Sequence, residues 1–229
     1  MPRTITTLTE FLENNLPDNR WQVTIADNAS TDSTQAVSEM LARQNPGVNY
    51  LRIPQKGRGR ALRTAWLDSH ADIVSYMDAD LSTDLSHFPQ LIAALESGSH
   101  IAVGSRLSKE SQVSRGFRRE FISRGYNLLI NSMFFTGLPD AQCGFKALTR
   151  ATAEAIVPSI KNNNWFFDTE LLVIAAKRGF NIASVPVKWI DDPTSTVNVV
   201  GTAKEDVKGL LRLRFGGVPR VERPAPLSL

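Results

Sequence analysis

The feature that most restricts the fold of this chain is a short apolar run followed at once by paired carboxylates. Residues 73–77 (IVSYM) are apolar and of strand length, and residues 78–84 (DADLSTD) follow them directly. Such a run predicts a buried strand, and open α/β sheets bind their ligands at strand ends. Positions two apart in an extended segment share one side, so Asp78 and Asp80 are placed to face one small ion. Carboxylate oxygens suit Mg²⁺ or Mn²⁺, and Mg²⁺ usually combines one or two carboxylates with substrate phosphates, which indicates a diphosphate substrate held through a metal.

Two other interpretations of this acidic turn compete with a diphosphate site. The first is chance, because a lone D-x-D pair occurs in many chains that bind no metal. The second is an EF-hand calcium loop, whose first ligands are imitated in spacing by Asp78, Asp80, Ser82 and Asp84. That loop requires Gly at its sixth position and Glu at its twelfth, where this chain has Thr83 and Pro89. The calcium interpretation is therefore excluded.

Strand-like and helix-like segments alternate through the first half of the chain. The pattern predicts helices at residues 5–15, 34–44, from near 60, and at 88–96, and strands at 21–26, 48–53, 73–77 and 101–106. Residues 27–34, between the first strand and its helix, form a turn rich in Asp, Asn, Ser and Thr, and residues 55–60 (QKGRGR) form a glycine-containing loop whose amides can approach an anion. This alternation favours a parallel, doubly wound α/β sheet.

The second half of the chain has a different character. A helix is expected at residues 118–135, basic at its start and apolar later, and it is either a core helix or one that lies on a membrane surface. Further predicted elements are a helix ending at Arg178 with Gly179 as its C-cap, a strand at 182–190 and a helix at 203–213. Residues 1–214 are expected to form one domain, and residues 215–229, with three prolines, a flexible tail.

Composition restricts the compartment and the partners. The net charge is only +3, but residues 106–124 hold five Arg and one Lys against two Glu. One cysteine, Cys143, leaves no internal disulfide and suits a reducing compartment. No apolar stretch reaches the roughly 18 residues that cross a bilayer, so we expect a soluble or peripheral protein on the cytoplasmic side. Nucleic-acid binding is disfavoured because the arginines lie in one site-like segment rather than along an aromatic-studded surface.

Five motifs in this order resemble those of family 2 glycosyltransferases of the polyprenyl-monophosphate type. The resemblance is nearest to dolichyl-phosphate β-glucosyltransferases and their actinobacterial relatives, and it spans about residues 21–214. The motifs are residues 26–32 (ADNASTD), 56–62 (KGRGRAL), 78–80 (DAD), 140–146 (DAQCGFK) and 165–172 (WFFDTELL). The first three are widespread in family 2, whereas the last two are more specific to enzymes that act on lipid monophosphates.

This resemblance implies a GT-A fold, a Rossmann-like and mostly parallel sheet flanked by helices, with a nucleotide-sugar donor, Mg²⁺ or Mn²⁺, and a polyprenyl or dolichyl phosphate acceptor at the membrane. It implies donor contacts from Asp27, Asn28, Lys56, Asp78, Ala79 and Asp80, with Asp78 and Asp80 also holding the metal. The implied catalytic residues are Asp80, Arg106, Arg119 and Asp140. The implied acceptor and phosphate contacts come from Arg118, Arg119, Arg124, Gln142, Asp168 and Glu170.

The chemistry of sugar transfer agrees with these residue types. A departing diphosphate needs its charge stabilised, which a metal and arginines supply. A phosphate acceptor is largely ionised at neutral pH, so positioning matters more than a strong base, and direct displacement with inversion fits. Asp140, Asp168 and Glu170 are candidates for holding sugar hydroxyls or aligning arginines, and the alternative is a structural role, with Asp168 as a helix N-cap. Cys143 has no histidine nearby in sequence and is interpreted as a packed residue.

The chain departs from the family pattern at two places. The family normally begins with an apolar strand ending in a P-x-Y-N-E type turn, whereas this sequence begins with the helix that would follow it, so the first strand is expected to be missing. Relatives also carry a basic residue after the serine at position 195, where this chain has Thr196. Lys188 and Lys204 remain as candidate substitutes for that cation.

The function predicted is metal-dependent, inverting transfer of a hexose from UDP-glucose or GDP-mannose to polyprenyl or dolichyl phosphate at the cytoplasmic membrane face. A membrane-spanning partner is a further expectation. Two alternatives remain open at this point. One is a family 2 enzyme with a polysaccharide, protein or small hydroxyl acceptor, and the other is a non-catalytic protein that binds nucleotide sugar. The sugar and the base also remain open.

Overall fold

The computed structural model describes residues 1–114, 117–190 and 199–227, without the side chains of residues 117–119, 199 and 200. In chain order the elements are α1 (Pro2–Asn15), β1 (Val23–Asn28), α2 (Thr34–Gln44), β2 (Val48–Ile53), α3 (Arg58–Leu67), β3 (Ile73–Met77), the 3-10 helix η1 (Leu85–His87), α4 (Phe88–Glu96), β4 (Ile101–Ser105), β5 (Gln112–Ser114), α5 (Phe117–Phe134), β6 (Phe145–Thr149), α6 (Arg150–Ile156), the 3-10 helix η2 (Val157–Ser159), α7 (Phe167–Lys177), β7 (Ile182–Pro186), β8 (Lys188–Ile190) and α8 (Val199–Gly216).

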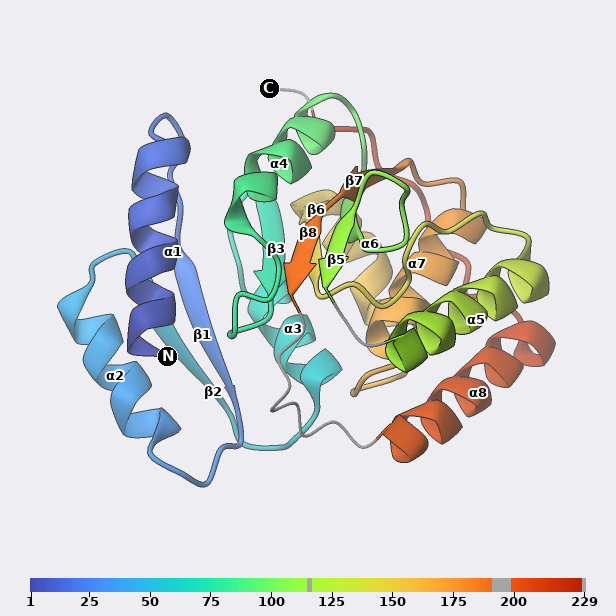
Figure 1. Cartoon of the computed structure of the whole chain (residues 1–229), viewed down its shortest axis with the longest axis horizontal. Helices are drawn as coiled ribbons and strands as arrows, with labels where there is room; N and C mark the ends of the chain where they lie inside the picture. Colours follow the sequence, from blue (N-terminus) through green and yellow to red (C-terminus); the bar gives the residue numbers. More distant parts are fainter. Residues whose placement is uncertain (115–116, 191–198, 228–229) are drawn as a thin grey trace.

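A four-stranded mixed sheet in the order β3-β6-β4-β7 forms the centre of the molecule (Figure 1). Strand β6 runs antiparallel to both β3 and β4, so these two strands run parallel to each other, and β4 pairs in parallel with β7. The pairing places Tyr76 opposite Lys146 and Met77 opposite Phe145. The predicted α/β class is confirmed, β3 and β4 run in the same direction as predicted, and the antiparallel β6 between them is an addition to that prediction.

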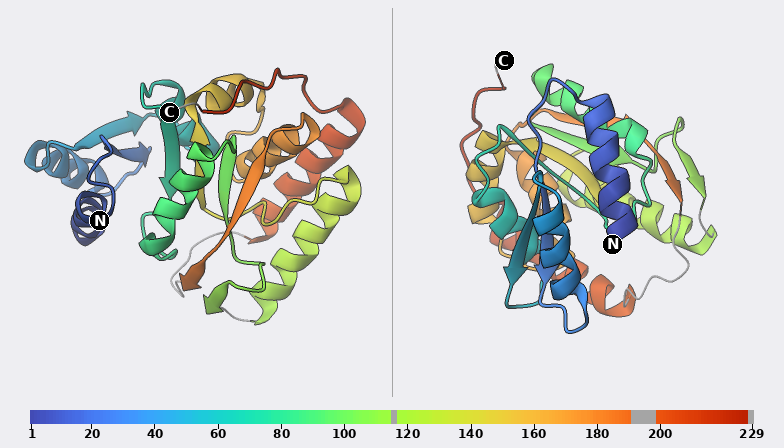
Figure 2. Two further views of the ribbon diagram at one scale, coloured as in Figure 1. Left: turned by 90° about the horizontal axis from the view of Figure 1, so that it is seen from above. Right: turned by 90° about the vertical axis from the view of Figure 1, so that its left-hand side faces the viewer.

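Helices cover both faces of this sheet (Figure 2). Helix α4 packs against β4, β6 and β7 on one face, while α3 and α6 contact β3 on the other, with α7 packed against α3 and α6. Helices α5 and α8 lie side by side at one end of the molecule, and β5 pairs in parallel with β8 to form a short ribbon.

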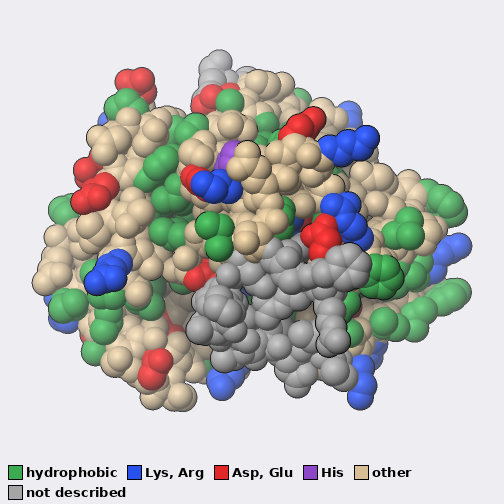
Figure 3. Space-filling view, in the orientation of Figure 1, with side chains coloured by type: hydrophobic (Ala, Val, Ile, Leu, Met, Phe, Trp, Pro, Cys, Tyr) green, Lys and Arg blue, Asp and Glu red, His purple; other side chains and the backbone are tan. Residues whose placement is uncertain are grey.

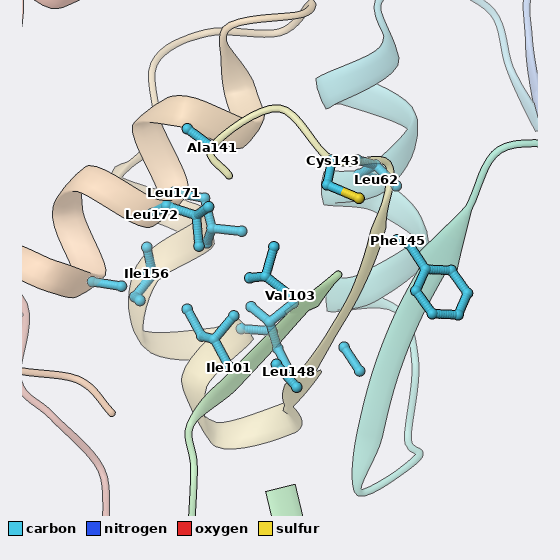
Figure 4. Close-up of a cluster of buried hydrophobic side chains, with 14 of the residues drawn as sticks. Leu62, Ile101, Val103, Ala141, Cys143, Phe145, Leu148, Ile156, Leu171 and Leu172 are labelled. Carbon is cyan, nitrogen blue, oxygen red and sulfur yellow. The ribbon is translucent and has the colours of Figure 1, made fainter. Parts of the chain in front are cut away.

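The main hydrophobic core lies between the sheet and the helices α6 and α7. Ile101, Val103 and Leu148 from the strands meet Leu171 and Leu172 of α7, and all five side chains are fully buried (Figure 4). Strands β4 and β6 are buried at every position, as expected for strands covered on both faces. This rigid centre holds the strand ends from which the candidate site residues project.

The β1–β2 pair forms a sheet of its own, apart from the central one. Among the described residues β1 pairs only with β2 and β3 only with β6, which leaves one unpaired edge on each. Helix α3 contacts β1, β2 and β3 and so joins the two sheets.

Two stretches of the second half differ from the elements that the sequence predicted. Residues 145–149, for which no strand was predicted, form β6, and the helix α6 that follows it was not predicted either. The single strand expected at residues 182–190 is two strands, because after Pro186, which has no N–H to donate, the chain leaves β4 and pairs with β5. The αL conformation of Gly179 after α7, with φ of 74°, confirms the predicted C-cap.

The segment after α8 has no helix or strand, but it contacts the domain. The guanidinium of Arg178 donates to the carbonyls of Val218 and Pro219, and His100 Nε2 lies 3.0 Å from the carbonyl of Pro224. Val218 also packs against the main core. The mobility of this tail in solution remains a prediction.

Candidate functional site

Asp78 directly follows β3, and two distant parts of the chain, Arg58 at the start of α3 and Gly144 before β6, lie against its carboxylate. Its Oδ1 accepts a hydrogen bond of 2.9 Å from Arg58, and its side chain is 47% exposed. Gly144 lies on its other side, so close that a Cβ at that position would meet Asp78 Oδ2 at 2.1 Å. A residue with a side chain cannot occupy position 144 without moving this carboxylate. The glycine of the DAQCG motif thus permits the approach of the loop to Asp78.

The surroundings of Asp78 raise its pKa. Desolvation by the surrounding protein is the largest cause, the charge of Arg58 opposes it, the charges of Asp80 and Asp168 add to it, and Arg106 lowers the pKa. The net result is a pKa above the ordinary value, chiefly because the charged carboxylate loses contact with water. A divalent cation beside Asp78 would stabilise that charged form.

Asp80 is exposed and belongs to a tight turn. Its Oδ1 accepts the amide of Ser82 at 3.0 Å, and the amide of Leu81 donates to the carbonyl of Asp78. Leu81 has φ of 53°, in the left-handed region that a residue with a γ-branched side chain rarely adopts. The turn therefore holds Asp80 near Asp78 at a cost in backbone strain, as functional loops often do.

The Asp78–Asp80 turn supplies two carboxylates for a metal ion. Within the part of the chain that the structure describes, no group of three or more His, Cys, Asp or Glu side chains is arranged to hold a metal. Two carboxylates fit a Mg²⁺-type site in which ligand phosphates and water complete the coordination. This donor set is thus suited to a cation that arrives with a diphosphate.

A buried network of charged side chains is linked to Asp78 through Arg58. Asp168 of α7 is 2% exposed, and its Oδ1 accepts a 2.6 Å hydrogen bond from Lys146 and a short one from the Tyr76 hydroxyl. Burial alone would raise the pKa of Asp168, but the charges of Lys146 and Arg58 outweigh it and lower the pKa. Asp168 is thus an ionised carboxylate whose oxygens are engaged by Lys146, Tyr76 and Arg58.

Arg106 and Asp140 form a second buried pair at the end of β4. The guanidinium donates through Nε (2.8 Å) and Nη2 (3.0 Å) to the two oxygens of Asp140, and the backbone amide of Arg106 also reaches this carboxylate. Burial would raise the pKa of Asp140, but the Arg106 charge and these hydrogen bonds lower it below the ordinary value. The other face of the guanidinium lies over the ring of Trp189, 5.5 Å from its centroid.

Asp27 organises the first polar turn rather than pointing freely from it. The carboxylate is 2% exposed and accepts hydrogen bonds from the Ser30 amide, the Tyr50 hydroxyl and Arg52. Desolvation raises the pKa of Asp27, but the hydrogen bonds from Ser30 and Tyr50 and the charge of Arg52 together lower it.

The neighbour of Asp27, by contrast, has an unused acceptor. The Oδ1 atom of Asn28 is buried and makes no hydrogen bond within the protein. The next residue, Ala29, has φ of 54°, so this turn, like the one after Asp80, is held in a left-handed conformation. Of the predicted pair, Asn28 is the one with an unsatisfied group for a ligand.

The glycines of the 56–62 motif bring α3 against the segment before α7. A Cβ on Gly57 would meet the carbonyl oxygen of Asn163 at 2.5 Å, and one on Gly59 would meet Phe167 at 2.6 Å. This close packing positions Arg58, whose guanidinium lies 4.8 Å from the ring centroid of Trp165 and 5.1 Å from that of Tyr76. Lys56, the residue predicted to contact the donor, is exposed beside this loop.

The other predicted site residues are distributed as follows. Glu170 is fully buried, accepts the amides of Lys161 and Asn162, and pairs with Arg212, which is a structural arrangement. Gln142 donates to Asp206 at 3.2 Å. Ala79 and Arg124 are exposed, and Arg124 pairs with Glu120. The side chains of Arg118 and Arg119 are outside the described residues.

The sequence also singled out Cys143, Thr196 and two lysines. Cys143 is fully buried, and burial raises the pKa of its thiol to about 12, which agrees with a packed residue rather than a nucleophile. The departure at Thr196 lies outside the described residues. Of its candidate substitutes, Lys188 pairs with Asp84 at 3.7 Å, and Lys204 is exposed on α8.

Sequence reasoning missed Arg58, Tyr76 and Lys146. Lys146 carried a usable signal, because a lysine in a strand-like run between Phe145 and Ala147 requires a buried carboxylate partner. Arg58 stood within a motif that was noted for its glycines alone. Nothing in the sequence around Tyr76 indicated that its hydroxyl would reach α7.

Two hollows lie at the surface of the described structure. One, of about 410 Å³, adjoins the acidic turn and is lined by residues 81–86 together with Thr7, Phe11, Lys188 and Ile190. The other, of about 550 Å³, lies over α2 and the β1–β2 sheet and contains none of the charged network around Asp78. The chemistry therefore points to the region of the acidic turn, although the second hollow is larger.

Comparison with known proteins gives consistent results at the levels of sequence and fold. Residues 1–157 match the sequence model of the family described as "Glycosyl transferase family 2". The chain is 34% identical over 199 residues to glycosyltransferase AglD of Haloferax volcanii, covering 86% of this chain and 32% of that protein. It is 31% identical over 205 residues to dolichyl-phosphate beta-glucosyltransferase ALG5C of Trichomonas vaginalis, covering 86% of this chain and 58% of that protein. This chain thus spans only part of the curated relatives it matches.

Solved structures show the same architecture. Glucosyl-3-phosphoglycerate synthase from Mycobacterium tuberculosis in complex with UDP superposes with a TM-score of 0.64 at 20% identity, covering 86% of this chain and 69% of that one. The same enzyme with Mn²⁺ and UDP-glucose gives a TM-score of 0.61 at 19% identity, covering 89% and 74%. At this level of identity the similarity establishes the fold, which is GT-A.

Proposed function

This chain belongs to glycosyltransferase family 2, and we propose that it transfers a hexose from a nucleoside diphosphate sugar to polyprenyl or dolichyl phosphate. The observation that carries the proposal is the Asp78–Asp80 turn at the end of β3, bordered by two positioned arginines, Arg58 and Arg106. This is the arrangement that a metal-bound diphosphate requires. The names of several relatives at about 30% identity, dolichyl-phosphate beta-glucosyltransferases, support the lipid phosphate as acceptor.

We propose glucose from UDP-glucose as the transferred sugar, with mannose from GDP-mannose as the alternative. Several relatives are named dolichyl-phosphate beta-glucosyltransferases, and the structural neighbour with bound UDP-glucose is named glucosyl-3-phosphoglycerate synthase. The orphan Oδ1 of Asn28 is an acceptor for an N–H of the base, and the strained turn at Ala29 keeps it in place. Donor contacts of Asp27 are proposed to be indirect, through the shape of this turn.

A divalent metal is proposed at Asp78 and Asp80. The structural neighbour binds Mn²⁺ together with UDP-glucose, and the two carboxylates here have the charge and spacing for Mg²⁺ or Mn²⁺. The bound ion would neutralise charge on the departing diphosphate. Position 144 must be glycine in this scheme, since a side chain there would displace Asp78.

The protein's own contribution to the reaction is positioning and charge stabilisation. Asp140 holds Arg106 by two hydrogen bonds and so prevents it from rotating away from the end of β4. A fixed guanidinium stabilises negative charge without reorganising during the reaction. An acceptor phosphate oxygen is already ionised, so it attacks the anomeric carbon directly, and the expected outcome is inversion. Arg118, Arg119 and Arg124, at the start of α5, are proposed to hold the acceptor phosphate.

We further propose that the protein works at the cytoplasmic face of a membrane, alone or with a membrane-spanning partner. No helix among the described residues is both long and apolar enough to cross a bilayer. Helices α5 and α8 expose Phe121 and Phe215, Phe135 follows α5 directly, and each of these side chains is more than 70% exposed. Lys and Arg side chains accompany them along this edge of the molecule (Figure 3). Such a surface supports peripheral contact with anionic lipid.

A second candidate is transfer to a water-soluble phosphate or hydroxyl acceptor, because the structural neighbours are named for 3-phosphoglycerate. A third is a protein that binds nucleotide sugar without turnover. The divided sheet, with its open edges on β1 and β3, is the observation that favours the third candidate.

The test is transfer of labelled sugar from UDP-glucose or GDP-mannose into an organic-extractable lipid, with polyprenyl phosphate and Mg²⁺ or Mn²⁺. We expect label in the lipid phase that is abolished by EDTA and reduced at least a hundredfold by Asp80→Asn, roughly the cost of losing one charge-stabilising group. Asp72→Asn, an exposed change at the opposite end of β3, is the matched control and should retain activity. Transfer of label to a product that stays in the aqueous phase would support the soluble acceptor. Donor binding without transfer would support the protein that binds nucleotide sugar without turnover.

A further inference from the structure

Arg58 occupies one of the two oxygens of the proposed metal ligand Asp78. Its Nη2 lies 2.9 Å from Asp78 Oδ1, and the guanidinium is only 19% exposed. The other proposed metal ligand, Asp80, contacts no cation at this distance among the described residues. In the structure, then, the positive charge next to Asp78 is supplied by the protein's own arginine.

The same guanidinium has a second carboxylate within reach. Arg58 Nη1 is 3.8 Å from Asp168 Oδ2, while Asp168 Oδ1 is held by Lys146 and Tyr76. Asp168 therefore cannot follow Arg58, because two buried groups fix it in place. Arg58, in contrast, is a long side chain with rotatable bonds, and it lies between a fixed carboxylate and an exposed one.

Two aromatic rings flank the Arg58 guanidinium. The ring centroids of Trp165 and Tyr76 are 4.8 Å and 5.1 Å from Arg58 Cζ. A cation over an aromatic face is held by the ring quadrupole without a directional hydrogen bond, so it can slide along the face. Trp165 therefore lies where its fluorescence can report movement of this charge.

We propose that Arg58 is an exchangeable internal counter-ion of Asp78, which a divalent cation displaces when it binds. The displaced guanidinium shifts toward Asp168, remains over Trp165 and Tyr76, and is then available to the donor diphosphate. This inference rests on the proposed function, since it assumes a metal at Asp78 and Asp80. It goes beyond that function in assigning Arg58 a competitive role before any donor is bound.

The exchange has a physical consequence for metal affinity. Before a cation binds, Asp78 is already partly neutralised, so the cation must compete with Arg58 and binds the free protein weakly. A diphosphate supplies the charge that Arg58 needs after it leaves Asp78, and so it promotes the exchange. Metal and donor are therefore expected to bind cooperatively, and Arg58 is expected to contribute part of that cooperativity.

The test measures Mn²⁺ binding by electron paramagnetic resonance of free Mn²⁺, without donor and with UDP. Arg58→Gln is expected to bind Mn²⁺ about fivefold more tightly than the unaltered protein without UDP, the size of a partly exposed ion pair. Arg60→Gln removes the same charge two residues further along α3 and is the matched control, because among the described residues Asp78 forms its ion pair with Arg58 and not with Arg60. It should change Mn²⁺ affinity by less than twofold. Arg58→Lys keeps the positive charge but lacks the planar guanidinium. Its Mn²⁺ affinity should lie between those of Arg58→Gln and Arg60→Gln.

A second readout follows Arg58 itself. Mg²⁺ titration should change the fluorescence of Trp165 in the unaltered protein, and Trp165→Phe should remove that change. Arg58→Gln should remove most of it while still binding metal. Equal Mn²⁺ affinity in Arg58→Gln and the unaltered protein, or the same increase in Arg60→Gln, would overturn the counter-ion role and leave the proposed function intact. Absence of Mn²⁺ binding to all variants, with and without UDP, would overturn both.

Discussion

At the scale of single residues, the site is built from buried charges that each require an oppositely charged partner. Asp168, Asp140, Glu170 and Lys146 are all at most 2% exposed, and each has an opposite charge within hydrogen-bond distance. A buried charge without a partner costs several kcal/mol, whereas a paired one is tolerated. The pairs therefore fix the position of each side chain more than they add to the net stability.

Replacing Lys146 by Met should strongly destabilise the protein. The change leaves Asp168 buried with only Tyr76 and the more distant Arg58, and breaking such a pair costs about 3 to 5 kcal/mol. The measurement is the free energy of unfolding in urea. Lys188→Met is the matched control, because its partner Asp84 is exposed and such a pair contributes at most about 1 kcal/mol.

The double variant Lys146→Met/Asp168→Asn extends this test. It should recover part of the loss, since it removes the uncompensated charge. A double variant no more stable than Lys146→Met alone would show that the lysine acts through packing instead of through its charge.

Asp206 should make stability depend on pH. It is 4% exposed on α8, its Oδ1 has no partner within the protein, and burial raises its pKa to about 6, with the Tyr126 hydroxyl lowering it and the charge of Glu205 raising it. The folded pKa lies above the unfolded value, so the stabilising contribution is complete below about pH 4 and is lost as pH rises through 6.

The variant Asp206→Asn removes this ionisation and keeps an acceptor for Gln142. At pH 8 it should be more stable than the unaltered protein by about 2 kcal/mol, and the difference should vanish near pH 4. Thermal unfolding at both pH values measures this. Exposed Asp18→Asn is the control, and a gain that is equal at both pH values would exclude ionisation of Asp206 as the cause.

At the scale of elements, α5 and α8 form a pair whose outward faces are apolar. Phe121 and Leu128 lie seven residues apart on α5 and are 72% and 71% exposed, and Phe135, which directly follows the helix, is 85% exposed. On α8, Leu211 and Phe215 are 47% and 82% exposed and lie one turn apart. The sequence left two interpretations of α5 open, a core helix or a surface helix. The structure combines them, because Ile130 and Phe134 are buried while these other residues face outward.

Polar replacements on this α5–α8 face should reduce binding to lipid without harming the fold. For Leu128→Gln/Phe215→Gln we expect at least a threefold loss of sedimentation with phosphatidylglycerol vesicles, since each change removes apolar area available for insertion. The free energy of unfolding should change by less than about 0.5 kcal/mol, because both side chains are exposed. Met40→Gln, an exposed apolar position on α2, is the control. Vesicle binding equal to that of the control would argue against this face as the lipid contact.

At the scale of the whole molecule, the last described residues contact regions far from them in the sequence. Val218 and Val221 pack against the main core, Arg223 donates to the carbonyl of Gly179, and Pro224 accepts from His100. These contacts lie near α7 and β7, at a distance from the acidic turn in the chain. They are expected to act on stability and not on the reaction.

Deletion of residues 218–229 is therefore expected to lower the free energy of unfolding by about 2 kcal/mol, from two half-buried valines and several hydrogen bonds. Deletion of residues 225–229 is the matched control, since it keeps the contacts of Arg178, Arg223 and His100. If the longer deletion leaves the unfolding midpoint unchanged, the tail is as flexible as its composition predicted.

Much of the fold was predictable because its signals are local. The apolar runs of β2 and β3, the bounds of α2 and α4, and the glycine after α7 follow from patterns within a few residues, and the structure confirms them. Strand β6 was missed because Lys146 interrupts its apolar pattern. A buried lysine is explained only by Asp168, which is 22 residues away in the sequence.

The sequence alone determined the α/β class, the family and the acidic turn that ends β3, because each depends on short-range periodicity and on motifs of adjacent residues. Tertiary structure decided which of the motif residues remain available to a ligand. Asp27, Asp168 and Glu170 are bound by partners from other elements, Asn28 and Asp80 are not, and Arg58 reaches Asp78 across 20 positions of the chain. The physical reason is that buried charges must find partners, and only the folded arrangement of strands and helices determines which partner each one meets.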